Sequence, residues 1–185
     1  MTDTGRSNPQ RLFLTGEPGC GKTTVVRRTA ELLTLHGLKV GGMTTSEIRK
    51  NGARVGFGIE NMLTHEHGIL AGLGPKSGGP RVGRYYVNLT DLEEIGVGAI
   101  QRAIDTAEVI ILDELGPMEL HSQRFVDAVE RSLASPKHLL ATIHKRAQHS
   151  LILQIRSNPT SAILEVTTRN RDNLSVDLVN RLVAT

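Results

Sequence analysis

The chain has 185 residues, of which 38% are hydrophobic, 22% are charged and only 3% are aromatic. This length and ordinary composition predict one globular domain and exclude a disordered or fibrous chain, and Cys20 is the only cysteine, so an internal disulfide is excluded too. The formal net charge of +3 comes from basic residues spread along the sequence, so the pattern does not favour a nucleic-acid partner.

The start of the chain and the lengths of its apolar runs indicate where in the cell the protein is expected. No apolar stretch approaches the roughly 18 residues that span a bilayer, and residues 1–9 lack the hydrophobic stretch of a signal peptide. Residues 1–9 contain Gly, Ser, Asn and Pro and are predicted to form a flexible leader. We therefore expect a cytoplasmic protein with a single domain at residues 10–185 and no membrane partner.

From residue 10 onward, short apolar runs alternate with longer amphipathic stretches. This alternation is typical of β-α units that build a mainly parallel sheet, so we predict a three-layer α/β sandwich. Arg11–Thr15 is predicted to be a buried strand and Lys22–His36 the helix after it, with Gly37 at the helix C-cap position.

The stretch after the first helix is predicted to be a β-hairpin inserted into the sheet. Its strands are Val40–Ile48 and Arg54–Ile59, and the sequence Lys-Asn-Gly at residues 50–52 is the turn signal. The glycine-rich segment Gly68–Gly83 is predicted to be a loop that leads to a short strand at Arg84–Asn88.

The second half of the chain continues the alternation of helices and strands. A helix is predicted to have Thr90 as its N-cap, with Glu93 in capping-box spacing, and to run to Thr106. Val109–Leu112 is continuously apolar and is therefore predicted to be the most deeply buried strand. The remaining predicted elements are a helix at Ser122–Ala134, a strand at His138–Ile143, a helix at Ala147–Arg156, a strand at Ala162–Val166 and a helix at Val176–Val183.

The loop between the first predicted strand and helix carries a phosphate-binding pattern. Gly-Glu-Pro-Gly-Cys-Gly-Lys-Thr at residues 16–23 fits the eight-residue P-loop (Walker A), whose glycines let successive backbone amides face phosphate oxygens. Lys22 is predicted to reach the β- and γ-phosphates, and Thr23 to ligate Mg²⁺. The alternative, a chance glycine turn, is disfavoured by the flanking strand and helix. The predicted nucleotide-binding residues here are Gly16, Glu17, Pro18, Gly19, Cys20, Gly21, Lys22, Thr23 and Thr24.

Two adjacent carboxylates follow the apolar strand Val109–Leu112. Asp113 has the Walker B position, where a carboxylate at the end of the sheet meets the magnesium site. Glu114 is predicted to be the general base that accepts a proton from the attacking water, which makes it catalytic together with Lys22. Other strands lie between the P-loop helix and Asp113 in sequence, an order that by analogy indicates the additional-strand, catalytic-glutamate type of P-loop protein.

Several polar residues near these motifs have weaker support. Thr142 and His144 end the next predicted strand and are candidate sensors of the γ-phosphate, although the pattern favours a satisfied strand-end threonine and an exposed histidine. Arg49 and Arg54 in the hairpin are candidates for neutralising transition-state charge, or belong to an outward charged face. Cys20 is either a thiol activated by the helix N-terminus or only a small residue.

Separated segments resemble the small P-loop nucleoside-triphosphatases known as the thermophilic or cancer-related nucleoside-triphosphatase family. The resemblance spans nearly the whole chain, and its most specific segment is Asp-Glu-Leu-Gly-Pro-Met-Glu-Leu at residues 113–120. The segments are Leu14–Thr24, Glu47–Arg49 with Gly56 and Phe57, Val82–Val87, Asp113–Leu120 and Glu165–Asp172.

The resemblance implies Mg²⁺-dependent hydrolysis of nucleoside triphosphates (ATP, GTP, CTP and UTP) with little base preference. It also implies that the segment after the Walker B strand belongs to the nucleotide site, namely Asp113, Glu114, Leu115, Gly116, Pro117, Met118 and Glu119. Near the end of the chain, the segment Asn170–Asp172 follows the last predicted strand and is predicted to contact the base, with a plain helix cap at Asp172 or Asn173 as the equal competing interpretation.

Two other functions use the same residues. A phosphotransferase would move the γ-phosphate to a nucleoside or another small acceptor. A nucleotide-gated switch would time a protein or RNA partnership by slow hydrolysis. The sequence disfavours the phosphotransferase, because it shows no convincing arginine-rich lid, and it names no protein partner.

Overall fold

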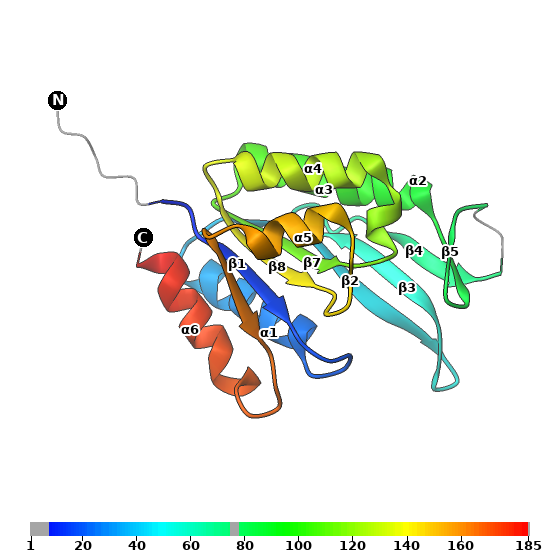
Figure 1. Ribbon diagram of the computed structural model, residues 1–185, viewed down its shortest axis with the longest axis horizontal. Helices are drawn as coiled ribbons and strands as arrows, with labels where there is room; N and C mark the ends of the chain where they lie inside the picture. Colours follow the sequence, from blue (N-terminus) through cyan, green and yellow to red (C-terminus); the bar gives the residue numbers. More distant parts are fainter. Residues whose placement is uncertain (1–7, 75–77, 185) are drawn as a thin grey trace.

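The computed structural model describes residues 8–74 and 78–184, and the described strands form one mixed sheet in the order β5-β6-β4-β3-β2-β7-β8-β1-β9 (Figure 1). The predicted leader lies outside the described residues except for Asn8 and Pro9, which have no regular structure. No helix among the described residues is long and apolar enough to cross a membrane.

One half of the sheet is parallel and holds the predicted buried strands. Neighbouring strands pair in parallel from β2 through β7, β8 and β1 to β9. The strand β8 lies between β1 and β7, so the P-loop strand and the Asp113 strand are not direct neighbours. The bounds are β1 Arg11–Thr15, β2 Val40–Lys50, β7 Val109–Leu115, β8 His138–Ile143 and β9 Ser161–Glu165. The predictions for β1 and β8 are confirmed to the residue.

The other half of the sheet is antiparallel. The predicted hairpin is confirmed: β2 pairs with β3, and Asn51 and Gly52 between them have φ angles of 49° and 78°, as a tight two-residue turn requires. Further antiparallel strands continue it, so the sheet is mixed, and the expectation of a mainly parallel sheet with one inserted hairpin is wrong. The bounds are β3 Ala53–Asn61, β4 His67–Leu73, β5 Arg81–Val82 and β6 Tyr85–Val87.

The predicted loop at Gly68–Gly83 is wrong where β4 and β5 occupy it; residues 75–77 lie outside the described residues. Gly68 permits close approach of a helix and does not break the strand. A Cβ on Gly68 would lie 2.5 Å from Ile95 Cδ1, and one on Gly56 of the paired strand would lie 2.5 Å from the Ala71 carbonyl oxygen. Leu70 and Ala71 of β4 are fully buried, which secures the strand against the core.

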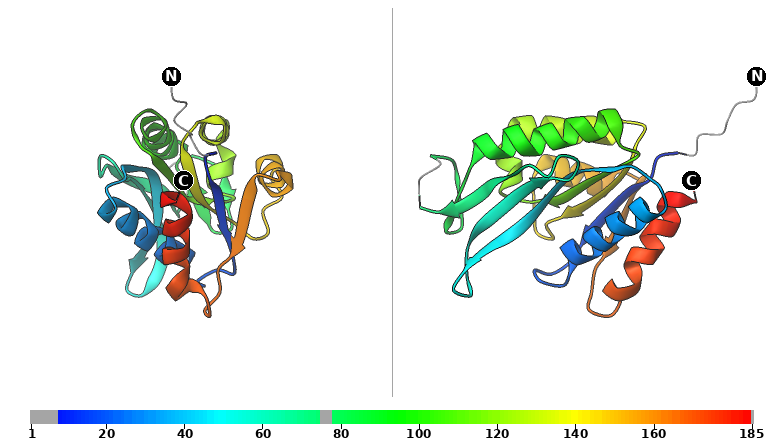
Figure 2. Two further views of the ribbon diagram at one scale, coloured as in Figure 1. Left: turned by 90° about the vertical axis from the view of Figure 1, so that its left-hand side faces the viewer. Right: turned by 180° about the vertical axis from the view of Figure 1, so that it is seen from behind.

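Helices cover both faces of the sheet and give three layers (Figures 1 and 2). Helices α1 (Lys22–Leu35) and α6 (Arg171–Val183) pack together on one face, over a core that includes Leu12, Leu14 and Ile111. The opposite face, including Phe13 and Leu112, is covered by α3 (Gly98–Thr106), α4 (Gln123–Ala134) and α5 (Ser150–Ser157).

Three predicted helix starts are wrong, because each helix begins at another residue than the predicted one. The N-cap of the helix that ends at Thr106 is Asn88, whose Oδ1 accepts from the Asp91 amide, while Glu93 accepts a hydrogen bond from Ser122. This helix is α2 (Leu89–Asp91), the π-helical η2 (Leu92–Val97) and α3 in succession. Helix α5 begins at Ser150 with His149 as its cap, α6 begins at Arg171, and a short 3₁₀ helix, η3, spans Glu119–His121.

Candidate nucleotide site

Residues 16–21 of the P-loop join β1 to α1, and Gly16 lies where a side chain would clash. A Cβ on Gly16 would lie 2.6 Å from the Val166 carbonyl oxygen and 2.8 Å from Cys20 Sγ. Gly21 is the N-cap of α1 with φ 108°, which L-residues rarely adopt. The loop therefore presents a helix N-terminus suited to anions.

Two lysines hold the loop in place. Lys22 Nζ donates to the Gly16 carbonyl oxygen at 3.1 Å, so its ammonium group lies folded over the loop that it extends from. Lys145, after β8, donates to Glu17 at 2.8 Å and to Glu165 at 2.9 Å. These two carboxylates raise the pKa of Lys145 to about 12, and Lys145 lowers the pKa of Glu17. The ion pairs tie the P-loop to β8 and β9.

Asp113 lies next to the start of α1, as the Walker B interpretation requires. Its side chain is buried, and its Oδ1 accepts a hydrogen bond from Thr142 at 2.6 Å. Burial raises the pKa of the Asp113 carboxyl, against the opposing effect of the Thr142 and Thr23 hydroxyls. Asp113 Oδ2 has no hydrogen-bond partner in the part of the chain that the structure describes. One buried acceptor thus remains for a ligand.

Glu114 lies within a local irregularity of β7, where Asp113 and Glu114 together lie opposite the single residue Thr142 of β8. Its carboxyl is half-buried and lines the main cavity, and its Oε1 has no hydrogen-bond partner among the described residues. Burial raises the pKa of Glu114, and the nearby Asp113 charge raises it further, while Lys22 and His144 lower it. Glu114 is therefore a stronger base than an exposed glutamate.

The turn after β7 carries a third carboxyl, that of Glu119. Its side chain is 5% exposed, and its Oε2 accepts a hydrogen bond from the Gly116 amide at 3.1 Å. Burial, with a contribution from the Glu114 charge, raises the pKa of Glu119 to about 8. Glu119 is thus mostly protonated and uncharged at neutral pH.

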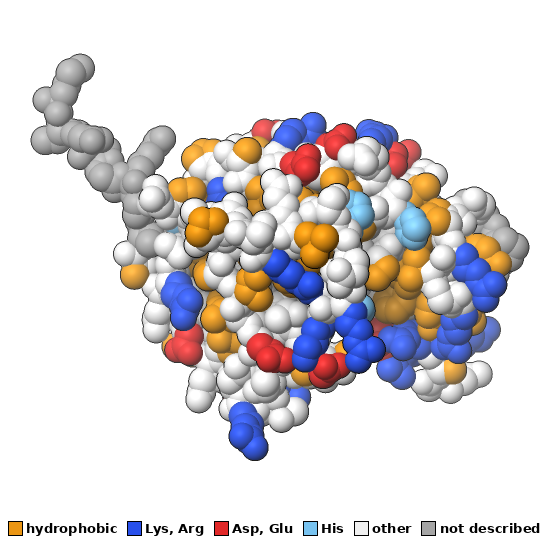
Figure 3. Space-filling model, in the orientation of Figure 1, with side chains coloured by type: hydrophobic (Ala, Val, Ile, Leu, Met, Phe, Trp, Pro, Cys, Tyr) orange, Lys and Arg blue, Asp and Glu red, His pale blue; other side chains and the backbone are white. Residues whose placement is uncertain are grey.

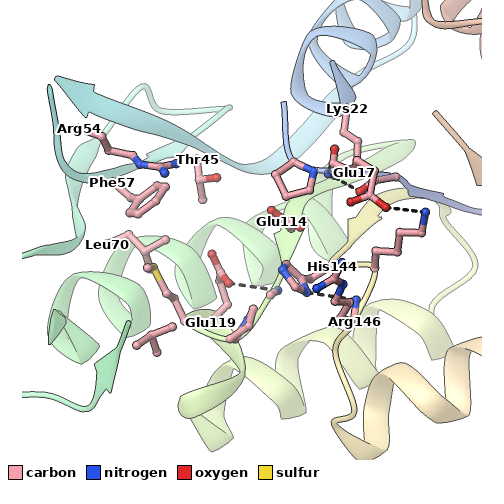
Figure 4. A pocket seen from close by; sticks show the side chains of 17 residues that line it. Glu17, Lys22, Thr45, Arg54, Phe57, Leu70, Glu114, Glu119, His144 and Arg146 are labelled. Carbon is pink, nitrogen blue, oxygen red and sulfur yellow. Dashed lines mark hydrogen bonds and ion pairs between the residues drawn. The ribbon is translucent and has the colours of Figure 1, made fainter. Parts of the chain in front are cut away.

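The main cavity has a volume of about 490 Å³ and joins these groups (Figure 4). It is lined by the P-loop, by the turn after β7, by the segment after β8 and by strands of the antiparallel half. The lining residues from the predicted site are Gly16, Glu17, Pro18, Lys22, Arg54, Glu114, Gly116, Pro117, Met118, Glu119 and His144. Sequence reasoning missed Thr45, Phe57, Leu70, Val82, Lys145 and Arg146, because they come from elements far apart in the chain.

A second hollow of about 300 Å³ lies beside the start of α1, lined by Gly21, Thr24, Val25, Arg28, Arg171 and Asp172. Asn170 precedes it, but its side chain bonds the Thr167 amide and the Glu165 carbonyl, so it orders the turn before α6. Arg171 and Asp172, which belong to the same predicted segment, line the hollow.

Three further candidates lie outside the main cavity or are already paired. Arg49 is exposed and donates to Glu47 and to the Gly52 carbonyl oxygen, so it lies in the hairpin and does not line the cavity. Arg54 lines the cavity and also pairs with Glu47 at 2.6 Å. Cys20 is half-buried and packs against the core beneath α1 and α6.

A glycine loop between a strand and a helix, with a buried aspartate at the end of a nearby parallel strand, defines a P-loop nucleotide-binding protein. Comparison with known proteins agrees. The family model described as NTPase matches residues 11–179. The nucleoside-triphosphatase THEP1 of Thermofilum pendens is 47% identical, over 95% of this chain and 96% of the relative, and that of Methanosarcina acetivorans is 45% identical, over 94% and 97%.

Solved structures extend the comparison to the fold. The crystal structure of THEP1 from Aquifex aeolicus superposes with a TM-score of 0.81 at 33% identity, covering 94% of this chain and 99% of that one. The solution structure of a human cancer-related nucleoside triphosphatase gives a TM-score of 0.81 at 34% identity, covering 95% and 98%. The chain belongs to the THEP1 family of nucleoside-triphosphatases, as the sequence resemblance predicted.

Proposed function

We propose that this nucleoside-triphosphatase hydrolyses ATP, GTP, CTP and UTP to the diphosphate and phosphate in a Mg²⁺-dependent reaction with little base preference. The observation that carries the proposal is the pair of buried carboxylate oxygens, Asp113 Oδ2 and Glu114 Oε1, that lack partners among the described residues. They are adjacent on β7, and Glu114 lines the same cavity as Lys22. Asp113 Oδ2 suits a metal ion as its ligand, and Glu114 Oε1 suits a water molecule as its hydrogen-bond acceptor.

Asp113 and Thr23 fit a magnesium ion. Mg²⁺ prefers oxygen ligands and usually binds through one or two carboxylates together with substrate phosphates. Asp113 offers an unpartnered buried oxygen, and the Thr23 hydroxyl lies near enough to lower the pKa of that carboxyl. When bound there, Mg²⁺ would supply positive charge to the β- and γ-phosphate oxygens.

The chain's own groups would do the rest of the work. The P-loop amides and the Lys22 ammonium bind the phosphates, which requires Lys22 to exchange its bond to the Gly16 carbonyl for the substrate. Glu114 accepts the proton of the attacking water, and its raised pKa strengthens it for this role. This assignment, with β8 placed between β1 and β7, supports the additional-strand, catalytic-glutamate type of P-loop protein.

The hollow beside α1 is where we place the base and sugar. Its walls come from Arg28, Arg171 and Asp172, whose long or charged side chains offer adaptable contacts in place of a fixed hydrogen-bond pattern. Such walls support little discrimination between bases, because strong rejection needs a site built around particular donors and acceptors. Asn170 would act here by shaping the turn before α6.

The test is phosphate release from each of the four triphosphates with Mg²⁺. The unchanged protein should release phosphate from all four, Lys22→Ala should bind them weakly, and Glu114→Gln should bind them but turn over roughly 10²–10⁴-fold more slowly. Glu94→Gln, which changes an exposed glutamate of η2, is the matched control.

Comparable turnover in Glu114→Gln would remove it as the base. Tight binding of all four nucleotides with negligible release by the unchanged protein would instead support a nucleotide-gated switch.

A further inference from the structure

The main cavity continues past Glu114, away from the P-loop (Figure 4). Lys22 and Glu17 lie on one side of Glu114, and Arg54, Phe57 and Leu70 lie on the other. We call the second part the distal chamber; its lining residues are Thr45, Arg54, Phe57, Leu70, Val82, Met118 and Glu119. Hydrolysis needs room only for a water molecule beside the γ-phosphate, so the distal chamber is unused by it.

The walls of the distal chamber are largely apolar. Phe57, Leu70, Val82 and Met118 come from β3, β4, β5 and the turn after β7. The Phe57 ring is held by an edge contact to Tyr85 at 5.1 Å between centroids and by the Arg54 guanidinium 5.4 Å above it. A concave apolar wall with a fixed aromatic ring and a few polar groups is typical of a small-molecule site. Figure 3 shows a hydrophobic hollow bordered by Lys and Arg side chains on this face.

The polar groups of the chamber favour an uncharged ligand. The charge of Arg54 is already paired with Glu47, and an unpaired ligand charge against apolar walls would lose its hydration. Glu119 accepts the Gly116 amide with Oε2 and, because its pKa is about 8, carries a proton at neutral pH. It is then a hydrogen-bond donor for a carbonyl oxygen or ring nitrogen, as heterocycles of the nucleobase kind present.

Building on the hydrolytic site proposed above, we propose that the distal chamber binds an uncharged, ring-bearing alcohol of about nucleoside size, whose hydroxyl replaces water as acceptor of the γ-phosphoryl group. The alcohol oxygen forms a bond to the γ-phosphorus while the bond from that phosphorus to the β–γ bridging oxygen breaks. The hydroxyl proton passes to Glu114, and the nucleoside diphosphate leaves with the bridging oxygen. Products are the phosphate monoester and the diphosphate.

The experiment supplies γ-³²P-ATP and Mg²⁺ with adenosine, guanosine, cytidine, uridine, thymidine or benzyl alcohol, and uses glycerol as an alcohol without a ring. Labelled monoester and free phosphate are separated and counted. At least one ring-bearing alcohol should give saturable transfer exceeding that to glycerol by roughly tenfold or more, because the chamber orients its hydroxyl. Val82→Trp, which fills the chamber, should lower the ratio of monoester to free phosphate by a similar factor.

Leu73→Trp is the matched control, since Leu73 lies on β4, is 47% exposed and is absent from the cavity wall; it should keep the ratio of the unchanged protein. If Val82→Trp does not fold, Phe57→Leu removes the ring with little loss of bulk and should lower the same ratio. Label found only in free phosphate with every alcohol, while ATP is consumed, overturns the chamber proposal alone. No consumption of ATP overturns the hydrolytic proposal and this one with it.

Discussion

Three carboxyl groups, those of Asp113, Glu114 and Glu119, gather at the end of β7, and burial raises the pKa of each. They differ in their partners. Asp113 has the Thr142 hydroxyl and one oxygen left over, Glu114 has an unpartnered oxygen among the described residues, and Glu119 has the Gly116 amide. The end of β7 and the turn after it thus hold the three carboxyl groups for which we propose the roles of metal ligand, base and neutral hydrogen-bond donor.

Glu119→Gln tests whether the buried Glu119 carboxyl is protonated in the folded protein. The folded protein holds the Glu119 proton up to a pKa of about 8, whereas the unfolded chain releases it near 4.5. Because the folded state binds that proton more tightly, the free energy of unfolding falls as pH rises through this window, and it does not fall further above it. Glutamine carries no proton to lose, so the variant should gain stability over the parent by roughly 4 kcal/mol between pH 5 and pH 9.

Urea unfolding at pH 5, 7 and 9 measures this difference. Glu94→Gln alters an exposed glutamate and should follow the parent at each pH. If Glu119→Gln also follows the parent, Glu119 is ionised in the folded protein, and its role as a neutral donor in the distal chamber fails.

Among the elements, those set by local pattern were predictable from the sequence. The continuous apolar runs of β1, β7 and β8 and the glycine loop before α1 are short-range signals, and they also located Lys22 and Asp113. Strand β4 was not predictable, because Gly68 and Gly72 read as loop residues until the close contact of Gly68 with η2 and the pairing of β4 with β3 are known. The distal chamber was missed for a related reason: its walls on β3, β4 and β5 meet only because these strands pair in the order β3-β4-β6-β5.

Gly42→Ala tests how tightly β2 is held against β7. Gly42 has φ 124°, and a Cβ there would lie 2.0 Å from the Ile111 carbonyl oxygen. Backbone must move to admit the methyl group, so the variant should lose about 3 kcal/mol or more of stability. The pairing of Thr44 with Asp113 lies two residues further along this ladder, so activity should fall as well.

Gly72→Ala is the matched control, since a Cβ on Gly72 in β4 meets nothing within 4 Å. Its stability should stay within about 1 kcal/mol of the parent. Thermal unfolding of the two variants checks the prediction, and an equal loss in both would mean that the contact with Ile111 is not what constrains β2.

In the whole molecule, β2 belongs to both halves of the sheet, pairing in parallel with β7 and antiparallel with β3. The main cavity lies where the halves meet, with the P-loop and β7 on the parallel side and Phe57, Leu70 and Val82 on the antiparallel side. Helix α1 and strand β7, which carry the groups proposed to bind the phosphates and the metal, also contribute buried residues to the two hydrophobic cores. A ligand at the P-loop therefore binds only when the whole domain is folded, because the elements that hold it are part of the two cores.

Nucleotide with Mg²⁺ should accordingly stabilise the whole chain against heat. A ligand that binds only the folded state at 100 times its Kd adds about 2.7 kcal/mol, which for a chain of this size raises Tm by roughly 5–11 °C. Glu114→Gln should keep this shift, because it removes the proposed base and leaves the groups proposed to bind the phosphates and the metal. Lys22→Ala should lose most of this shift, whereas Lys39→Ala, which changes an exposed lysine before β2, should keep it.

Removing Mg²⁺ with EDTA should reduce the Tm shift in the unchanged protein, since Asp113 then faces the phosphates without a cation between them. A shift that EDTA leaves intact would contradict the metal-binding role of Asp113 and Thr23, even if Lys22 proves essential.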